Sequence, residues 1–417
     1  MLKLLIIADD FTGALDNAVQ FVKKGIETQV VTGAQLDRTA ISATAQVLVV
    51  DSETRPMSAA DAYHSVMRIV RQGIRMGVKV IYKKTDSALR GNVGSELSAV
   101  LDATGGKRIY FIPAFPAVRR ITLKGVHYID GVRLEESSFG QDPFDPMDCS
   151  SVPEILARQT EKPVISVSVG EPIPRQRAGQ EILVFDALKD GDILTRVEEL
   201  RRRGELCLLA GCAGFASFLP DALGLTGNYR GEVRKSKCFY VACGSLNPIT
   251  REQLRYAQEN GFYRGTLTPE QKLWPEYYET EQGGRFLQRL TGICQSRRLV
   301  EMDSFDPDGQ ETTDEYAARF GIGNEEIRFS VSACHGRIVR HLLEQNMDMT
   351  VLMTGGDTLM GFMKEIGVNQ LTPVAEVGQG TVLSQLLWKG KVLQVISKSG
   401  GFGDEAVLVK IAQQVVA

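Results

Sequence analysis

Residues 4–25 read LLIIADDFTGALDNAVQFVKKG, an apolar run followed by two acids and then a helical pattern. The run over 4–8 is typical of a strand that is buried on both faces of a sheet. From Gly13 to Lys24 the apolar side chains recur at helical spacing, and Gly25 suits a helix end. A buried strand that leads directly into a helix indicates an α/β fold with a parallel sheet.

The same alternation continues along the first half of the chain. We expect helices over 59–76 and 192–203, and further strands over 28–31, 46–50, 78–82, 108–112, 181–185 and 206–210. Between residues 121 and 177 prolines crowd together, which indicates an excursion over the surface or an edge element.

A second series of strands and helices follows the polar segment 228–237. Its expected helices cover 249–260, 330–345 and 359–365, and its expected strands cover 238–242, 299–302, 350–353 and 392–397. The sequence therefore predicts two Rossmann-like α/β domains, residues 1–230 and 235–417, with mostly parallel sheets and an active-site cleft between them.

The composition excludes several classes of protein. The formal net charge of −3 over 417 residues argues against nucleic-acid binding through bulk charge. No apolar stretch approaches the ~18 residues that span a bilayer. The seven cysteines are scattered, as is typical of reduced thiols in a core, and four histidines argue against a His-rich metal site. We expect a cytoplasmic protein without a nucleic-acid or membrane partner.

Polar residues follow the strands of the first series. Asp9 and Asp10 stand where a dinucleotide-binding fold carries glycines, and carboxylates there suit hydroxyl groups, a metal ion or proton transfer. One of the two could instead simply cap the helix. Residues 83–92, KKTDSALRGN, mix cations, hydroxyls, an acid and an amide, which suits a polyhydroxy acid. Arg55 could grip its carboxylate with two hydrogen bonds. A polar connecting loop and a solvated arginine are the alternatives.

Glycine-containing turns follow three strands of the second series. They are Gly244-Ser245, TGGDT at 354–358 and KSGGFGD at 398–404. Such turns expose N–H groups and helix N-termini to phosphate, although none matches the P-loop pattern. Ten glycines fall within residues 355–403, a concentration that we interpret as backbone shaped for close approach to phosphates.

Seven segments together resemble the four-carbon acid sugar kinase family, in order and over essentially the whole chain. They are IADDFTGA (7–14), KTDSALRGN (84–92), PAFP (113–116), GVHY (125–128), GS (244–245), TGGDT (354–358) and KSGGFGD (398–404). The resemblance implies that the N-terminal domain binds a tetronate, that the C-terminal domain binds ATP, and that the 4-hydroxyl is phosphorylated. The family often has Gly-Arg shortly after PAFP, whereas this chain has Val118-Arg119-Arg120, which leaves open which arginine contacts the ligand.

The expected site follows from these observations together. The tetronate is expected to contact Asp9, Arg55, Lys83, Lys84, Thr85, Asp86 and Arg90. ATP with Mg²⁺ is expected to contact Ser245, Gly355, Gly356, Asp357, Thr358 and Gly401. Either Asp86 or Asp9 would accept the proton of the attacking hydroxyl, and no metal ligand is assigned.

Three questions of function stay open at this point. D-threonate is the expected acceptor, with D-erythronate and 3-oxo-tetronate as alternatives. A nicotinamide-dependent oxidoreductase is disfavoured because acids replace the glycine fingerprint after the first strand. A metabolite-binding protein without activity would bind the same ligands and release no ADP. A homodimer is expected only from the general frequency of dimers.

Overall fold

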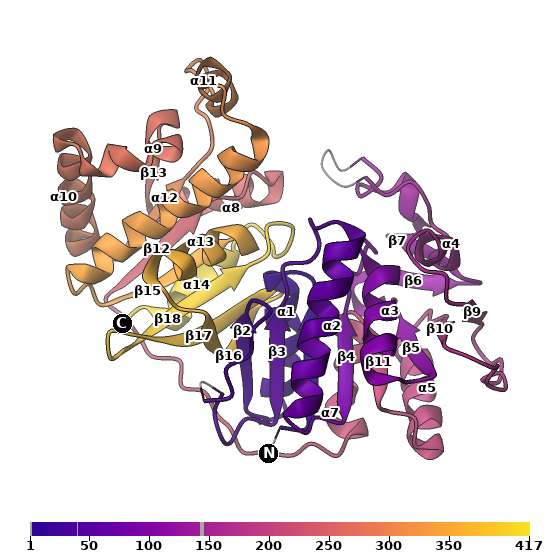
Figure 1. The fold of residues 1–417 in the computed structure, drawn as a ribbon. Coiled ribbons are helices and arrows are strands. Elements are labelled where there is room, and N and C mark those ends of the chain that lie inside the picture. The colour runs from indigo at the N-terminus through magenta and orange to yellow at the C-terminus, as the bar shows by residue number, and fades with distance from the viewer. Residues whose placement is uncertain (1, 40, 142–145) are drawn as a thin grey trace. The chain divides into compact units, whose positions relative to one another are not determined.

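The computed structural model describes residues 2–39, 41–141 and 146–417 (Figure 1). The chain forms two compact units, Met1–Arg230 and Gly231–Ala417. Both are α/β units with mostly parallel sheets, so the predicted fold class is confirmed. The expected cleft between the two units stays a prediction.

The first unit is built on a parallel sheet with the strand order β2-β3-β1-β4-β11-β5-β10-β9. The strands are β1 (Leu4–Ala8), β2 (Thr28–Thr32), β3 (Val47–Asp51), β4 (Val80–Lys84), β5 (Arg108–Ile112), β9 (Val164–Val167), β10 (Glu181–Phe185) and β11 (Leu208–Gly211). In the register Ala8 pairs with both Asp51 and Lys84. The residues that follow β1, β3 and β4 therefore meet at one edge of the sheet.

Helices cover both faces of this sheet. They are α1 (Phe11–Val22), α2 (Ala59–Arg75), α3 (Val93–Thr104), α4 (Val152–Ala157), α5 (Asp190–Arg203), α6 (Ala213–Ala216) and α7 (Leu219–Ala222). The helices α2 and α3 lie side by side (Figure 1), and they share one core with Leu5 and Ile7 of β1. Because side chains alternate along a strand, Leu4 and Ile6 face the opposite side of the sheet.

Residues 121–177 include the edge element that the sequence predicted, since β9 ends the sheet order. They also include most of a small antiparallel sheet of β6 (Arg120–Leu123), β7 (Val126–Ile129) and β8 (Val132–Arg133), which we call the hairpin sheet. Short 3-10 turns, η1 (Pro116–Val118) and η2 (Leu134–Glu136), flank it. The hairpin sheet was not predicted.

The second unit has the strand order β13-β14-β12-β15-β18-β17-β16. Its strands are β12 (Cys238–Cys243), β13 (Tyr263–Thr266), β14 (Leu299–Asp303), β15 (Met349–Thr354), β16 (Gln370–Gly378), β17 (Thr381–Trp388) and β18 (Lys391–Lys398). The strands β12 to β15 and β18 are parallel, whereas β17 runs antiparallel to both β16 and β18. The carboxyl ends of β12, β15 and β18 lie next to one another, because these three strands are neighbours.

The helices of the second unit connect these strands. They are α8 (Pro248–Glu259), α9 (Pro269–Leu273), α10 (Glu281–Ser296), α11 (Thr313–Phe320), α12 (Asn324–Glu344), α13 (Gly356–Ile366) and α14 (Val407–Val415), with a 3-10 turn η3 (Pro275–Glu279). A core formed by β12, β15 and β18 with α8 and α14 includes Val241, Leu352, Ile396, Leu254 and Leu408.

Two findings bear on the predicted surroundings of the protein. Within the described ranges, no helix is both long and apolar enough to cross a membrane. All seven cysteines are free thiols, and all except Cys207 are buried, which agrees with the prediction of reduced core cysteines.

Candidate active site

A cluster of charged side chains lies at the carboxyl ends of β1, β3 and β4 in the first unit. Asp9 directly follows β1, and Lys84 is the last residue of β4. The Nζ atom of Lys84 lies 2.9 Å from Oδ1 of Asp9 and 2.6 Å from Oδ1 of Asp10. Arg55, in the loop after β3, places Nε 2.8 Å from Oδ2 of Asp9. The parallel register thus brings together residues that are 75 positions apart in the chain.

Asp86 joins this cluster through Arg90 and through Arg55, which also contacts Asp9. Its Oδ2 atom accepts a hydrogen bond from Nε of Arg90 at 2.7 Å, and Nη2 of Arg55 lies 3.8 Å from its Oδ1 atom. Nη2 of Arg55 also lies 3.0 Å from Oδ1 of Asp10. The acid cluster, as we call Asp9, Asp10 and Asp86 together, is therefore matched by Arg55, Lys84 and Arg90.

The charges in this cluster hold one another in their ionised forms. Burial by itself would raise the pKa of Asp9, but Arg55 and Lys84 outweigh it and hold that pKa below its ordinary value. Asp86 behaves alike, because Arg55 and Arg90 overcome the effect of burial and lower its pKa. Burial would lower the pKa of Lys84, but Asp10 and Asp9 raise it. At neutral pH both Asp9 and Asp86 are carboxylates that can accept hydrogen bonds from a substrate hydroxyl.

One acid of the cluster, Asp10, also caps the N-terminus of helix α1. The side chain of Asp10 accepts a hydrogen bond from the backbone N–H of Gly13 at 3.1 Å and so caps α1. Gly13 has a steric reason to lack a side chain, since a Cβ atom there would lie 1.8 Å from Nζ of Lys84. The two acids therefore have both expected kinds of role: Asp10 caps the helix, and Asp9 and Asp10 both bind the ammonium of Lys84.

Lys83 and Thr85 differ from the other predicted substrate residues. Nζ of Lys83 lies 3.1 Å from Oε2 of Glu96 on α3, and both side chains are fully buried. The carboxylate partner of Lys83 is therefore Glu96 and not Asp9, although its ammonium also donates to the Lys84 carbonyl at 2.7 Å and its charge helps to lower the pKa of Asp9. The Thr85 hydroxyl is also buried and, within the described part of the chain, has no hydrogen-bond partner. A buried hydroxyl without a partner is a group that a ligand can satisfy.

The hairpin sheet contacts the residue that follows Asp86. Nη1 of Arg120 donates a hydrogen bond to the Ser87 hydroxyl, and Nε2 of His127 lies 2.9 Å from the Ser87 carbonyl oxygen. A ring nitrogen beside a carbonyl must carry the proton, so Nδ1 of His127 accepts from the Thr122 hydroxyl at 3.1 Å. Burial lowers the pKa of His127 to about 4, so the ring is neutral at physiological pH.

Arg120 and Arg119, which the sequence could not tell apart, lie in different surroundings. The side chain of Arg119 is 74% exposed and its nearest carboxylate is that of Asp130. The guanidinium of Arg120 lies 5.0 Å from the ring centre of Phe139, as does that of Arg90. Among the residues that the structure describes, no carboxylate lies within ion-pair distance of Arg120. The sequence left the choice between the two arginines open, because only the folded hairpin sheet brings Arg120 to Ser87.

The predicted nucleotide residues occupy three neighbouring turns in the second unit. Gly355 has φ of 87°, a left-handed conformation that favours glycine, and it is followed at once by α13. Its N–H donates to the carbonyl of Lys398 at 2.9 Å. The N–H of Ser245 donates to Oγ1 of Thr354 at 3.4 Å, so the turns after β12, β15 and β18 are joined.

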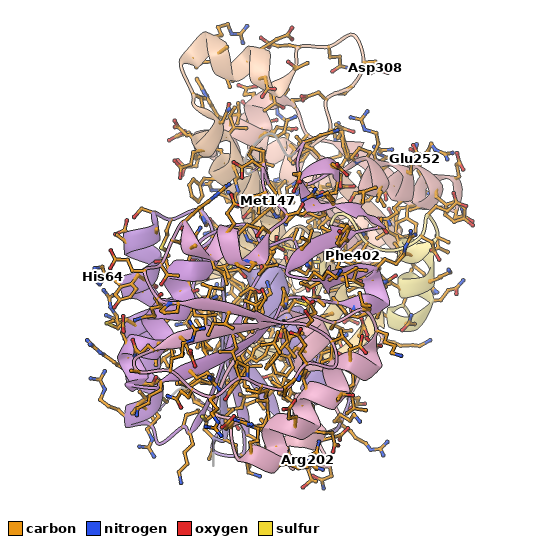
Figure 2. The ribbon with its side chains drawn as sticks, turned by 90° about the vertical axis from the view of Figure 1, so that its right-hand side faces the viewer. His64, Met147, Arg202, Glu252, Asp308 and Phe402 are labelled. Carbon is orange, nitrogen blue, oxygen red and sulfur yellow. The ribbon has the colours of Figure 1, made fainter. Side chains whose placement is uncertain are left out.

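Two glycines in these turns are required by close packing. A Cβ atom at Gly244 would lie 2.4 Å from Oγ1 of Thr358, and one at Gly400 would lie 2.7 Å from Oγ of Ser245. The Gly400 carbonyl accepts a hydrogen bond from Oγ1 of Thr250 at 3.0 Å. Gly401 is exposed in the same turn, which ends with Phe402 (labelled in Figure 2) and Gly403.

The glycine concentration over residues 355–403 has more than one cause. Gly367 ends α13, while Gly380 and Gly390 lie in the turns that join β16 to β17 and β17 to β18. Gly361 packs its backbone against Ser332 of α12, where a Cβ atom would lie 2.6 Å away. The interpretation of all ten glycines as phosphate-facing was therefore wrong, and for those in the turns after β15 and β18 it stays a prediction.

Asp357, the one carboxylate among the predicted nucleotide residues, is already paired. Arg328 of α12 binds it through two hydrogen bonds, Nε to Oδ2 at 2.6 Å and Nη2 to Oδ1 at 2.7 Å. In the described residues no group of three or more His, Cys, Asp or Glu side chains is arranged to hold a metal ion.

One α/β unit thus carries a cluster suited to a hydroxy acid, and the other carries turns suited to phosphates, a combination typical of small-molecule kinases. The chain belongs to the four-carbon acid sugar kinase family. Residues 4–219 match the family's sugar-binding N-terminal domain, and residues 240–408 match its nucleotide-binding C-terminal domain.

Individual relatives agree with this assignment. The chain is 28% identical to a D-threonate kinase of Salmonella typhimurium, over 98% of this chain and 97% of the relative. It is 29% identical to a D-threonate kinase of Bordetella bronchiseptica, over 98% and 96%. A crystal structure of a Salmonella typhimurium protein, 22% identical, superposes with a TM-score of 0.79 over 98% of each chain and shows the same fold.

Proposed function

We propose that this protein is an ATP-dependent kinase that phosphorylates the 4-hydroxyl of a four-carbon sugar acid, with D-threonate as the preferred acceptor. The observation that carries the proposal is the acid cluster with its three matched cations in the family's sugar-binding domain. The names of the two full-length relatives support D-threonate as the acceptor.

The first unit would bind the sugar acid through both kinds of charge. Arg55, Lys84, Arg90 and Arg120 are the cations at this edge of the sheet, and a substrate carboxylate would bind among them. The buried hydroxyl of Thr85 would donate to or accept from a substrate hydroxyl. Lys83 stays part of the prediction only as a neighbouring charge, because its ammonium is paired with Glu96.

We assign the proton-accepting role to Asp86 in preference to Asp9. Both oxygens of Asp9 are bound at 2.8 to 2.9 Å by Arg55 and Lys84. Among the described residues Oδ1 of Asp86, in contrast, accepts only a long hydrogen bond of 3.4 Å from Arg90, with Nη2 of Arg55 at 3.8 Å. An oxygen with spare hydrogen-bonding capacity is the better acceptor for a proton that leaves the attacking hydroxyl.

The second unit fits a nucleotide polyphosphate. Gly355, whose own N–H donates to the Lys398 carbonyl, turns the chain in its left-handed conformation into the start of α13. The first backbone N–H groups of α13, together with those of Gly400 and Gly401, would face the phosphates. Ser245, Gly355, Gly356, Asp357, Thr358 and Gly401 are the residues that we propose to contact ATP, which supplies the phosphoryl group. Mg²⁺ usually keeps several waters and binds one or two carboxylates with the phosphates. Asp357 is the carboxylate in these turns, and it would have to exchange its pairing with Arg328 to bind the ion.

D-erythronate and 3-oxo-tetronate are the alternative acceptors, since further relatives are named D-erythronate kinase and 3-oxo-tetronate kinase. The acids differ at single carbons, which only a correctly placed hydrogen bond can distinguish. A homodimer and a cytoplasmic location remain predictions, and light scattering on the purified chain tests the first of them.

The test is ADP release with ATP and Mg²⁺ against D-threonate, D-erythronate and 3-oxo-tetronate. The proposal predicts ADP release with D-threonate, at a kcat/KM at least tenfold higher than with either of the other two acids. A tenfold preference for another acid would show that this acid is the acceptor, and the proposed kinase activity would stand. Binding of the acids without any ADP release would instead identify a metabolite-binding protein.

A further inference from the structure

The second unit buries a positive charge that has no carboxylate partner. Lys398 is the last residue of β18 and is 1% exposed. Its Nζ atom donates a hydrogen bond to the carbonyl oxygen of Ser399 at 3.0 Å. Within the part of the chain that the structure describes, no carboxylate oxygen lies within ion-pair distance of this ammonium group. In the first unit, by contrast, the cations Arg55, Lys84 and Arg90 each pair with a carboxylate of the acid cluster.

The sheet register places Lys398 beside the three turns after β12, β15 and β18 that are proposed to bind the nucleotide. Cys243 of β12 pairs with Thr354 of β15, and Thr354 in turn pairs with Lys398. The three residues therefore form one row across the carboxyl ends of adjacent strands, and all three are buried. Thr354 accepts the hydrogen bond from Ser245 in this row. Lys398 is thus next to the residue that anchors the first nucleotide turn.

The acids and the thiol of the neighbouring elements do not supply a counter-charge. Cys243 is the titratable neighbour in the row, and burial raises the pKa of its thiol to about 12, so it is neutral. Asp404, in the loop before α14, is bound by Lys410 at 2.5 Å. Asp357 is bound by Arg328, and Asp303 at the end of β14 is bound by Arg264 at 2.8 Å. Thr381 of β17, the remaining strand neighbour of Lys398, carries no charge.

An unmatched buried ammonium is unfavourable, and an anion bound beside it would offset that cost. Burial lowers the pKa of Lys398 to about 8, which expresses this cost. The turns on either side of Lys398 are those that fit phosphates: Gly355 donates to its carbonyl, and Ser399 to Gly403 follow it. A nucleotide polyphosphate bound there would provide the missing anion.

We propose that Lys398 is a nucleotide-contacting residue, whose ammonium binds a phosphate oxygen of the nucleotide held by the turns after β12, β15 and β18. The inference rests on the proposed function and adds a residue to it. It also gives nucleotide binding a pH dependence. The free protein loses the proton of Lys398 as the pH rises through about 8, whereas bound phosphate raises the pKa and keeps the proton in place. Above this pH, binding must take up a proton, so affinity falls as the pH rises.

The experiment is calorimetric titration of the full chain with ADP in the presence of Mg²⁺, at about pH 7.5 and about pH 9. Each titration is done in two buffers of different ionisation enthalpy, which reports the number of protons taken up. For the wild type we expect affinity to fall by about tenfold between the two pH values, with close to one proton taken up at the higher pH. Lys398→Arg keeps its charge throughout, so it should bind ADP without this fall.

Two further variants complete the design. Lys398→Met should bind ADP at least tenfold more weakly at about pH 7.5 and take up no proton at either pH. Lys410→Met is the matched control, because Lys410 is exposed on α14 and pairs with Asp404 outside the row. It should behave as the wild type. If Lys398→Met does not fold, the contrast between the wild type and Lys398→Arg still tests the proton uptake.

The outcomes separate the two proposals. Equal affinity and equal proton uptake in the wild type, Lys398→Arg and Lys398→Met would overturn the role of Lys398 while leaving the kinase intact. Failure of the wild type to bind ADP at either pH would overturn the nucleotide site, and with it the proposed function.

Discussion

The side chains of Lys83 and Lys84 leave opposite faces of the sheet in the first unit and pair with different carboxylates. Nζ of Lys84 is 2.9 Å from Oδ1 of Asp9, whereas Nζ of Lys83 is 3.1 Å from Oε2 of Glu96 on α3. Successive side chains of a strand point to opposite faces, so the two adjacent lysines at the end of β4 pair with different carboxylates. Lys84 binds the acid cluster, and Lys83 forms a buried ion pair with Glu96.

The Lys83–Glu96 pair should act on stability rather than on substrate binding. Lys83→Met leaves Glu96 buried without its cation and should lower the free energy of unfolding by about 3–5 kcal/mol. The double variant Lys83→Met with Glu96→Gln removes both charges and keeps the hydrogen bond from Thr54. It should regain most of that stability and keep kcat/KM within a few fold of the wild type. Urea unfolding and steady-state assays measure both. A double variant that folds but is inactive would contradict this prediction and would show that Lys83 is needed for substrate binding or turnover.

Asp86 and Asp9 should differ in the step that their loss affects. Asp86→Asn removes the proposed proton acceptor and should lower kcat by about 10²–10⁴, with little change in the KM for ATP. Asp9→Asn weakens the positions of Arg55 and Lys84 and should chiefly raise the KM for the sugar acid. Steady-state kinetics with each substrate varied in turn measure the two effects. Near-normal turnover in both variants would contradict the assignment of the base.

Arg119 and Arg120 provide a matched pair of substitutions one residue apart. Arg120→Met removes the guanidinium beside Ser87 and should raise the KM for the sugar acid by about tenfold or more, since a hydrogen bond to a charged group contributes about 1.5–3 kcal/mol. Arg119→Met removes an exposed side chain and should leave the kinetics unchanged. Equal effects of the two substitutions would contradict the placement of Arg120 at the substrate.

His127 should make the first unit less stable in acid. Its pKa in the folded protein is about 4, below the ordinary 6.5, so the unfolded chain binds a proton first as the pH falls. Stability is therefore lost between these two values, by about 2 kcal/mol on going from about pH 7.5 to about pH 5. His127→Gln cannot titrate, and its loss over this range should be smaller by that amount.

Hydrogen exchange of peptides from β4 and β7 measures this change within the first unit. The control is His64→Gln, because His64 is exposed on α2 of the same unit (Figure 2). It should follow the wild type at both pH values. Parallel acid loss in the wild type and in His127→Gln would show that the ring of His127 does not titrate as its burial requires.

Much of the fold could be predicted from the sequence because its parallel strands are continuous apolar runs. β1 and β5 begin and end at the expected residues. β4 was expected over 78–82 and is found at Val80–Lys84, because a buried pair of lysines does not read as strand. The strands β16 and β17 were not predicted. Pro373 interrupts the first, and polar residues such as Ser384 and Gln385 interrupt the second, although both pair along most of their length.

The candidate site was predictable wherever the strand ends supply its residues. Asp9, Arg55, Lys84 and Asp86 lie together because each follows or ends a neighbouring strand of one parallel sheet. Arg120 and Lys398 could not be placed in this way. The first depends on how the hairpin sheet folds back onto Ser87. The second depends on which cations find a carboxylate, which is a property of the packed structure and not of the local sequence.

The matched charges of the acid cluster have a consequence for inhibitor design. Three carboxylates already balance Arg55, Lys84 and Arg90, which leaves Arg120 for the acid group of a ligand, so a second negative charge on a compound would have to displace an internal partner. Simple polyanions should therefore be poor leads against this half of the enzyme. Compounds that combine one acid with several hydroxyl or amine groups can exchange hydrogen bonds with both signs of charge, and such zwitterionic scaffolds are the better starting point for selective inhibitors.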